Sequence, residues 1–330
     1  MAILATQKVL TLDYWQVAND LRPGDYVFDR NGKIVQIKLA QVYRADNCYE
    51  VMFSDHLTLQ GDDKLRLPLE DRHYRIKSDR YKARLAFRRP LKMLSVADLL
   101  EAPLKDKRSR LKYSVPTTKP LQLPHQTLPV PPFVFGFWFF NQLTSGNFVP
   151  LAGTSEFIQQ KFKDAGYKIR KRKIAFNKER EFSTTPTVIS HLIPNVPTKI
   201  QNNYLLAAPD QRFELLQGIL YSKPRQYNKK YNRFRFSSKF LPIATQVQYL
   251  AESLGCKTTL FYDENRNSYT VFIRTKLQFY PDKQSPSTAV HQARRLVTNI
   301  TQIEPQACVH IETTGEDNTI LVGEGFISCL

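Results

Sequence analysis

The side chains best suited to covalent or metal chemistry in this chain are its four cysteines. They are spread over the sequence, with no CxxC pair and no histidine at the spacing of a zinc site: Cys48, Cys256, Cys308 and Cys329. The segment Gly323-Glu324-Gly325 is a lone GxG without the further glycines of a phosphate-binding loop. We therefore interpret the cysteines as buried thiols, and we do not expect nucleotide-dependent chemistry.

Charge is the strongest signal in the composition. The 330 residues include 48 Lys and Arg against 30 Asp and Glu, a formal charge of +18, which favours a polyanionic partner. The length and the 42% hydrophobic content predict about two domains with real cores. No run of about 18 apolar residues is present, and the first 30 residues are rich in aspartate. We expect a soluble intracellular protein without a membrane span, signal peptide or import presequence, and a monomer if it is free.

Secondary-structure signals divide the chain into three parts. Short alternating segments broken by turn residues predict an all-β module from Lys8 to about Leu67, and short strands return from Leu296 to Leu330. Ser95 is the expected N-cap of a short amphipathic helix. The region between the β parts has helical periodicity and further strands, as in these ranges: Phe133–Phe140, Ser155–Ala165, Arg212–Leu220, Tyr231–Phe236, Thr245–Leu254 and Tyr269–Arg274. An α/β part is thus predicted inside an all-β part.

Five strings resemble the blocks of one protein family, in the family's order. They are ATQKVLTLDYWQVANDLRPGDYVFDRNGKIVQI (Ala5–Ile37), LPVPPFVFGFWFFNQ (Leu128–Gln142), YLLAAPDQRFELLQGILYSKP (Tyr204–Pro224), FSSKFLPIATQVQYLAESLGCKTT (Phe236–Thr259) and IEPQACVHIETTGEDNTILVGEGFI (Ile303–Ile327). Together they make the chain similar to an intein of the phage and replicative-helicase type. In such inteins a Hint splicing domain is interrupted by a LAGLIDADG (DOD-type) homing endonuclease.

The resemblance implies a composite of all-β and α+β parts. A split, horseshoe-like all-β Hint domain would be interrupted by a pseudo-two-fold αββαββα LAGLIDADG domain. The implied boundaries are residues 1–104 for the N-terminal Hint part with a basic extension, 105–127 for a linker rich in proline and lysine, 128–282 for the endonuclease-like domain with halves 128–203 and 204–282, and 283–330 for the C-terminal Hint part. Because the two motif helices of this family pack through glycines, a helix contact is implied at Gly136 and Gly218.

The positions that the resemblance assigns to splicing lack the required side chains. Splicing begins when a Cys or Ser attacks its own preceding carbonyl, and that position falls at Ala2. The assisting histidine aligns with Lys64, and the sequence ends in Ser328-Cys329-Leu330 where the family has a His-Asn pair. Cys308 aligns with an alternative nucleophile of a minority class of inteins. A remnant reaction at Cys308 therefore stays open beside its interpretation as a buried thiol.

The nuclease positions are also altered. The family cleaves DNA with one carboxylate at the foot of each motif helix, and the pair holds divalent metal. The aligned residues are Asn141 and Lys223; an amide supplies no anionic ligand, and an ammonium group repels Mg2+. We interpret Asp210 and Glu214 as solvated residues near a helix N-terminus. We expect no cofactor, with Mg2+ required only by a residual nuclease.

Basic residues remain where the family grips duplex DNA with the outer faces of two sheets. They are Lys168, Arg170, Lys171, Arg172, Lys173, Lys178 and Arg180 in the first half, and Arg225, Lys229, Lys230, Arg233, Arg235 and Arg274 in the second. Between Arg233 and Phe236, charge and aromatic side chains alternate with period two, which predicts a strand that offers one face to phosphate. An ordinary solvated strand is the alternative. Residues 72–89 and 105–112 are also basic, and a flexible solvated linker is the alternative there.

Three functions follow from these observations. The favoured one is a nucleic-acid-binding protein derived from an intein and homing endonuclease, with splicing and nuclease activities lost and a basic saddle that binds duplex DNA or structured RNA. The second is a structural subunit of a large ribonucleoprotein such as a ribosome, in contact with protein neighbours. The third is a residual DOD-type homing endonuclease or self-cleaving intein, or a decaying element without a selected role.

Overall fold

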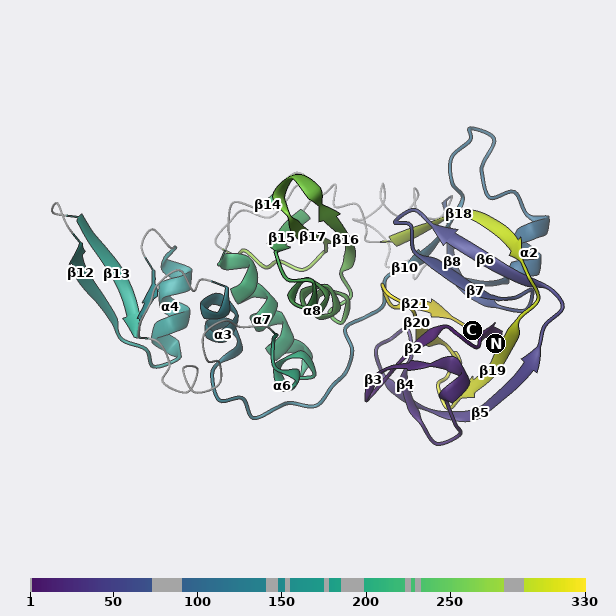
Figure 1. The fold of residues 1–330 in the computed structure, drawn as a ribbon, viewed down its shortest axis with the longest axis horizontal. Helices are drawn as coiled ribbons and strands as arrows, with labels where there is room; N and C mark the ends of the chain where they lie inside the picture. The colour runs from purple at the N-terminus through teal and green to yellow at the C-terminus, as the bar shows by residue number, and fades with distance from the viewer. Residues whose placement is uncertain are drawn as a thin grey trace, which may run out of the picture. The chain divides into compact units, whose positions relative to one another are not determined.

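The chain forms two compact units, and the second is inserted in the sequence of the first (Figure 1). In this computed structural model, the first unit comprises Met1–Leu121 and Ala293–Leu330, and the second comprises Gln122–Gln292. The structure describes residues 2–72, 91–140, 148–151, 155–174, 178–184, 199–222, 227–228, 233–281 and 294–330, with 148–150, 171–174 and 178–184 described by their backbone alone. The predicted composite of an interrupted all-β part and an α+β part is confirmed.

Antiparallel strands make up most of the first unit. Their order is β21-β20-β2-β4-β5-β19-β1-β7-β6-β18-β10-β8-β9, with β3 paired to β2. The short helix α2 (Val96–Glu101) and a 3-10 turn (Ala18–Asp20) accompany them. The strands are β1 (Ala2–Leu4), β2 (Lys8–Thr11), β3 (Tyr14–Val17), β4 (Tyr26–Phe28), β5 (Ile34–Arg44), β6 (Cys48–Phe53), β7 (Thr58–Asp62), β8 (Arg66–Asp71), β9 (Lys92–Ser95), β10 (Tyr113–Pro116), β18 (Arg294–Ile303), β19 (Ala307–Thr313), β20 (Ile320–Val322) and β21 (Ile327–Cys329).

Strands from the two ends of the chain interleave in this sheet. β1 lies between β19 and β7, with Leu4 opposite Cys308 and Ile3 opposite Gly61. β18 pairs with β6, and β19 pairs with β5. The resulting core draws on both segments, since Val51 and Val297 are both fully buried in one cluster. Residues 294–330 therefore complete the sheet that residues 2–72 begin.

The segment expected to be a linker, 105–127, is partly built into the first unit. Within it, β10 pairs with β18 on one side and β8 on the other, and Val115 is fully buried. Further along, the carbonyl of Pro120 lies against Gly32, where a Cβ would come within 2.2 Å of that oxygen. Because the strand is only four residues long and lies near lysines and prolines, its sequence is too short to show a strand pattern.

The second unit repeats one arrangement twice. Its first half has sheet order β11-β13-β12, and its second half has β14-β15-β17-β16. The order β15-β17-β16 matches that of β11-β13-β12, and β14 is an additional strand at the edge beside β15. The elements are α3 (Pro132–Phe139), β11 (Phe148–Pro150), α4 (Glu156–Asp164), β12 (Ile169–Ile174), β13 (Lys178–Thr184), α6 (Asn202–Leu205), α7 (Pro209–Tyr221), β14 (Tyr227–Asn228), β15 (Arg233–Ser238), α8 (Leu241–Glu252), β16 (Lys257–Asp263), a 3-10 turn (Glu264–Arg266) and β17 (Ser268–Arg274). None of the described helices is both long and apolar enough to cross a membrane.

Helices α3 and α7 cross at two glycines and lie side by side (Figure 1). A Cβ added to Gly136 would come within 2.4 Å of the Leu215 carbonyl oxygen, and one added to Gly218 within 2.1 Å of the Phe133 carbonyl oxygen. The structure thus brings together the two residues that the resemblance implied as the helix contact. Each helix ends two residues before an aligned nuclease position, α3 at Phe139 and α7 at Tyr221.

Candidate nucleic-acid interface

Strand β15 separates aromatic from basic side chains. Phe234 and Phe236 are each 2% exposed and lie on one face, while the half-buried Arg233 and Arg235 lie on the other. The alternation predicted from the sequence is therefore confirmed for this strand. Helix α8 packs against the same sheet. The arginine-bearing face is the candidate for phosphate contacts.

Three cations form one row across this sheet. Arg233 is opposite Arg274 on β17, and Arg274 is opposite Lys257 on β16. Residues that are directly opposite on neighbouring strands point to the same face of the sheet, and their Cβ atoms are about 5 Å apart. Like charges at two such positions destabilise the sheet. Arg274 is exposed, whereas Lys257 is only 6% exposed. An anion bound along the row would offset the repulsion.

Lys257 was not among the basic residues singled out from the sequence. Lys257 is the one charged residue between Ser253 and Tyr262, so the composition does not identify this stretch as basic. Only the strand pairing places it in line with the two arginines. The row of Arg233, Arg274 and Lys257 is called the cation row below.

The remaining groups on this face restrain the arginines. The Arg233 guanidinium lies 4.8 Å from the centre of the Phe272 ring, a cation–π distance. Arg235 Nη2 lies 3.7 Å from Asp263 Oδ2. Phe261 stacks on Phe272 with centroids 5.4 Å apart and is 39% exposed. The face therefore combines fixed guanidinium groups with aromatic surface.

In the first half, strand register divides the basic residues between two faces. Arg172 is opposite Arg180, whereas Lys171 is opposite Glu181 and Lys173 is opposite Glu179. Because residues alternate between faces along a strand, one face of the β12–β13 pair holds a net basic set: Arg170, Arg172, Lys178 and Arg180. On the opposite face each lysine of β12 is matched with a glutamate. Lys168 precedes β12 and is exposed.

Several predicted positions lie outside the described residues: Asn141, Lys223, Arg225, Lys229 and Lys230. The chemistry of the first two does not fit the metal that the resemblance implies, since neither an amide nor an ammonium group supplies the anionic oxygen that Mg2+ prefers. Within the described ranges, no group of three His, Cys, Asp or Glu side chains could hold a metal ion.

Two of the positions assigned to splicing, Ala2 and Cys308, lie in the interior of the first unit. Ala2 and Cys308 are 1% and 0% exposed and share a small buried cluster with Cys48. Nearby, the Tyr43 hydroxyl donates to the Asp62 carboxylate, which also accepts the backbone N–H of Lys64 at 3.0 Å. The structure thus brings Ala2 and Cys308 together, while Lys64 is exposed.

Burial suppresses the reactivity of Cys308. Desolvation by burial, with a smaller contribution from the neighbouring Cys48, raises the pKa of its thiol to about 12. The nucleophilic form of a cysteine is the thiolate. At neutral pH this thiol is therefore protonated, which is unfavourable for a nucleophile.

The fold and these sites define a class: an interrupted β-domain joined in one chain to a two-fold α+β unit with basic sheets. No family model matches the chain. It is 26% identical over 307 residues to the replicative DNA helicase DnaB of Mycobacterium intracellulare. The aligned region covers 87% of this chain and 49% of that helicase. The chain thus spans about half the length of this curated relative.

Solved structures similar to parts of the chain fall into two groups. The MchDnaB-1 intein is 26% identical over 21% of this chain and 53% of its own, with a TM-score of 0.20. The homing endonuclease I-DmoI, solved in complex with its target DNA, is 14% identical over 44% of this chain and 86% of its own, with a TM-score of 0.31. DnaB inteins and a LAGLIDADG endonuclease are therefore its structural neighbours, in agreement with the predicted resemblance.

Proposed function

We propose that this protein binds nucleic acid through the basic sheet faces of its second unit and has lost the chemistry of the proteins that it resembles. The observation that carries the proposal is the cation row. Like charges directly opposite one another on neighbouring strands destabilise a sheet, and an anion along the row would offset that repulsion. A phosphate backbone supplies such anions at regular spacing.

Duplex DNA is the favoured ligand. The second unit has two sheets in corresponding positions after the motif helices, each with a basic face. Such a pair suits contacts to phosphates on both sides of a double helix. I-DmoI, one of the neighbours, is described in complex with its target DNA. Phosphate contacts position a protein without reading sequence, so we expect weak sequence specificity.

Loss of catalysis is the second part of the proposal. Asn141 and Lys223 replace the two carboxylates that the resemblance assigns to metal binding. Ala2 has no nucleophile, and Cys308 is buried with a pKa raised to about 12. Each change removes a group that the corresponding reaction requires.

The proposal is tested by fluorescence anisotropy of the full chain with a random DNA duplex and a structured RNA of matched length. Affinity is measured over a range of salt with Mg2+ present, and strand integrity is then checked on a gel. We expect a steep fall of log affinity with log salt, tighter binding to the duplex, and intact strands. Preference for RNA would favour the ribonucleoprotein alternative, and cut strands would disprove the loss of nuclease activity.

A matched pair of variants locates the site. Arg233→Gln/Arg274→Gln removes two charges from the cation row, and Lys239→Gln/Arg266→Gln removes two exposed charges elsewhere in the same half. The first should reduce the slope of log affinity against log salt by up to about two, while the second leaves it nearly unchanged. Equal effects of the two variants would show that net charge alone governs binding.

A further inference from the structure

A second basic structure lies in the first unit, in the loop between α2 and β10 (Figure 1). Five of the eight residues in the segment Lys105–Lys112 are lysine or arginine. The segment is a hydrogen-bonded hairpin, since Lys105 pairs with Leu111 in a β-bridge and the Asp106 N–H donates to the Arg110 carbonyl at 2.9 Å. At its tip, Ser109 has φ +57°. The loop is therefore a built hairpin that carries a concentrated positive charge.

Asp106 organises this hairpin. Its Oδ1 accepts the backbone N–H groups of Arg108 and Arg110 at 2.9 and 3.0 Å. Its Oδ2 lies 2.8 Å from Arg110 Nη2 and 3.4 Å from Arg72 Nε, so one carboxylate fixes two guanidinium groups from different parts of the sequence. The hydrogen bonds from Arg110 lower the pKa of Asp106 to about 2.

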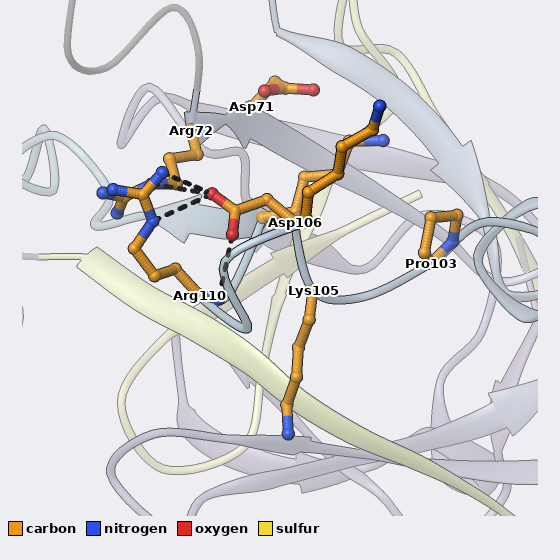
Figure 2. Close-up of a pocket in the computed structure, with 8 residues that line it drawn as sticks. Asp71, Arg72, Pro103, Lys105, Asp106 and Arg110 are labelled. Atoms are coloured by element: carbon orange, nitrogen blue, oxygen red, sulfur yellow. Dashed lines mark hydrogen bonds and ion pairs between the residues drawn. The ribbon is translucent and has the colours of Figure 1, made fainter.

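Among the described residues, the ion pairs of this carboxylate are with the two arginines and not with Lys105 or Lys107. Figure 2 shows the Arg72 and Arg110 side chains directed at Asp106, while the Lys105 side chain extends away from it. Lys105 and Lys107 are exposed. They line an open cavity of about 650 Å3 together with Arg72, Arg110 and Lys112. Asp71 and Asp106 are the acids of that lining, so five cations face two carboxylates.

We propose that the hairpin and this cavity bind phosphodiester groups of a nucleic-acid backbone, as a contact separate from the sheets of the second unit. A lysine ammonium group is a flexible point charge suited to phosphate, and guanidinium groups held in place by a carboxylate present their remaining N–H donors in a fixed direction. The cations are spread along an open hairpin. That arrangement suits successive phosphates of a polymer better than one enclosed phosphate group.

The test compares variants of the full chain in the anisotropy titration with duplex DNA. Lys105→Gln/Lys107→Gln should lower the slope of log affinity against log salt by about one to two, because each lost phosphate contact lowers it by about 0.9. Lys33→Gln/Lys38→Gln removes two exposed charges elsewhere in the first unit and should leave the slope unchanged. Equal effects of these two variants would overturn the inference.

The outcomes separate this inference from the proposed function. If Arg233→Gln/Arg274→Gln weakens binding and Lys105→Gln/Lys107→Gln does not, the hairpin site is wrong and the proposed function stands. If only the hairpin variant weakens binding, the hairpin site stands and the cation row is wrong. Release of the duplex by inorganic phosphate, but not by chloride at equal ionic strength, would indicate a single-phosphate site and overturn the assignment to a polymer.

Asp106→Ala tests whether the arrangement matters beyond its charge. The substitution raises the net charge by one and removes the carboxylate that orders the hairpin. A built site predicts weaker binding despite the added charge, whereas attraction by net charge alone predicts tighter binding and would overturn the inference. The thermal unfolding midpoint of the variant, measured beside that of the unchanged protein, establishes that the first unit remains folded.

Discussion

Arg295 and Asp55 form an ion pair inside the first unit, with Arg295 Nε 3.1 Å from Asp55 Oδ2 and the two side chains 1% and 3% exposed. Arg295 is near the start of β18, and Asp55 lies in the turn between β6 and β7. The pair therefore joins the C-terminal segment of the chain to the N-terminal one. Gly325, at φ +86°, leaves room for the arginine, since a Cβ there would come within 2.5 Å of Arg295 Nη2.

Loss of this arginine should be costly. Arg295→Met removes the guanidinium from beside a buried carboxylate, and breaking such a pair typically costs about 3–5 kcal/mol of unfolding free energy. Denaturant unfolding measures the change. The control is Arg266→Met, whose side chain is 62% exposed and 3.7 Å from Asp263; an exposed pair is worth about 1 kcal/mol at most. Similar losses for both variants would contradict a special role for the buried pair.

The crossing of α3 and α7 should not tolerate a methyl group. Gly136→Ala places a Cβ within 2.4 Å of a backbone carbonyl oxygen, so the helices must separate, at an expected cost of about 1–3 kcal/mol or more. Gly218→Ala should behave alike. Gln160→Ala on the exposed side of α4 is the control, with an expected change within about 0.5 kcal/mol. Thermal unfolding checks all three, and an unchanged midpoint for Gly136→Ala would show that the crossing is looser than described.

Features that depend on a single helix could be predicted from local signals in the sequence. Ser95 was recognised as an N-cap, and its hydroxyl accepts the Asp98 N–H at 3.0 Å while the Asp98 carboxylate accepts the Ser95 N–H at 2.7 Å. The helix over residues 209–221 was recognised from its periodicity, within three residues at its start and one at its end. Such features depend on contacts a few residues apart, which a single sequence contains.

Features that depend on pairing between distant strands were not predictable in this way. Lys257 joins the cation row only because β16 pairs with β17 in one register. In the sequence Cys48 and Cys308 are far apart, yet sheet pairing places them in one buried cluster. The basic composition of Lys105–Lys112 predicts a linker. The segment instead forms a hairpin, because the Asp106 carboxylate and the pairing at its base hold it together.

Cys308 should resist alkylation and should make the protein less stable at high pH. Its pKa is raised to about 12 in the folded state, while an unfolded cysteine has a pKa near 8.5. As pH rises above about 8.5, the unfolded state loses its proton first and then binds fewer protons than the folded state, so the unfolding free energy falls. The stabilisation that the protonated, buried Cys308 thiol provides is fully present below about pH 8.5. Cys308→Ala should make the fall between pH 9 and 11 shallower in denaturant titrations, and rapid modification of native Cys308 by a thiol reagent at pH 8 would contradict its burial.

The two faces of the β12–β13 pair should differ in their effect on binding. Arg172 and Arg180 are opposite each other on the face without a matching acid, whereas Lys171 and Lys173 are opposite glutamates. Arg172→Gln/Arg180→Gln should therefore weaken duplex binding and reduce its salt slope by up to about two. Lys171→Gln/Lys173→Gln removes the same charge from the compensated face and should have a much smaller effect. Anisotropy titration of both variants measures the contrast, because long-range attraction to a protein of charge +18 would weaken both alike, while phosphate contacts at one face weaken only the first.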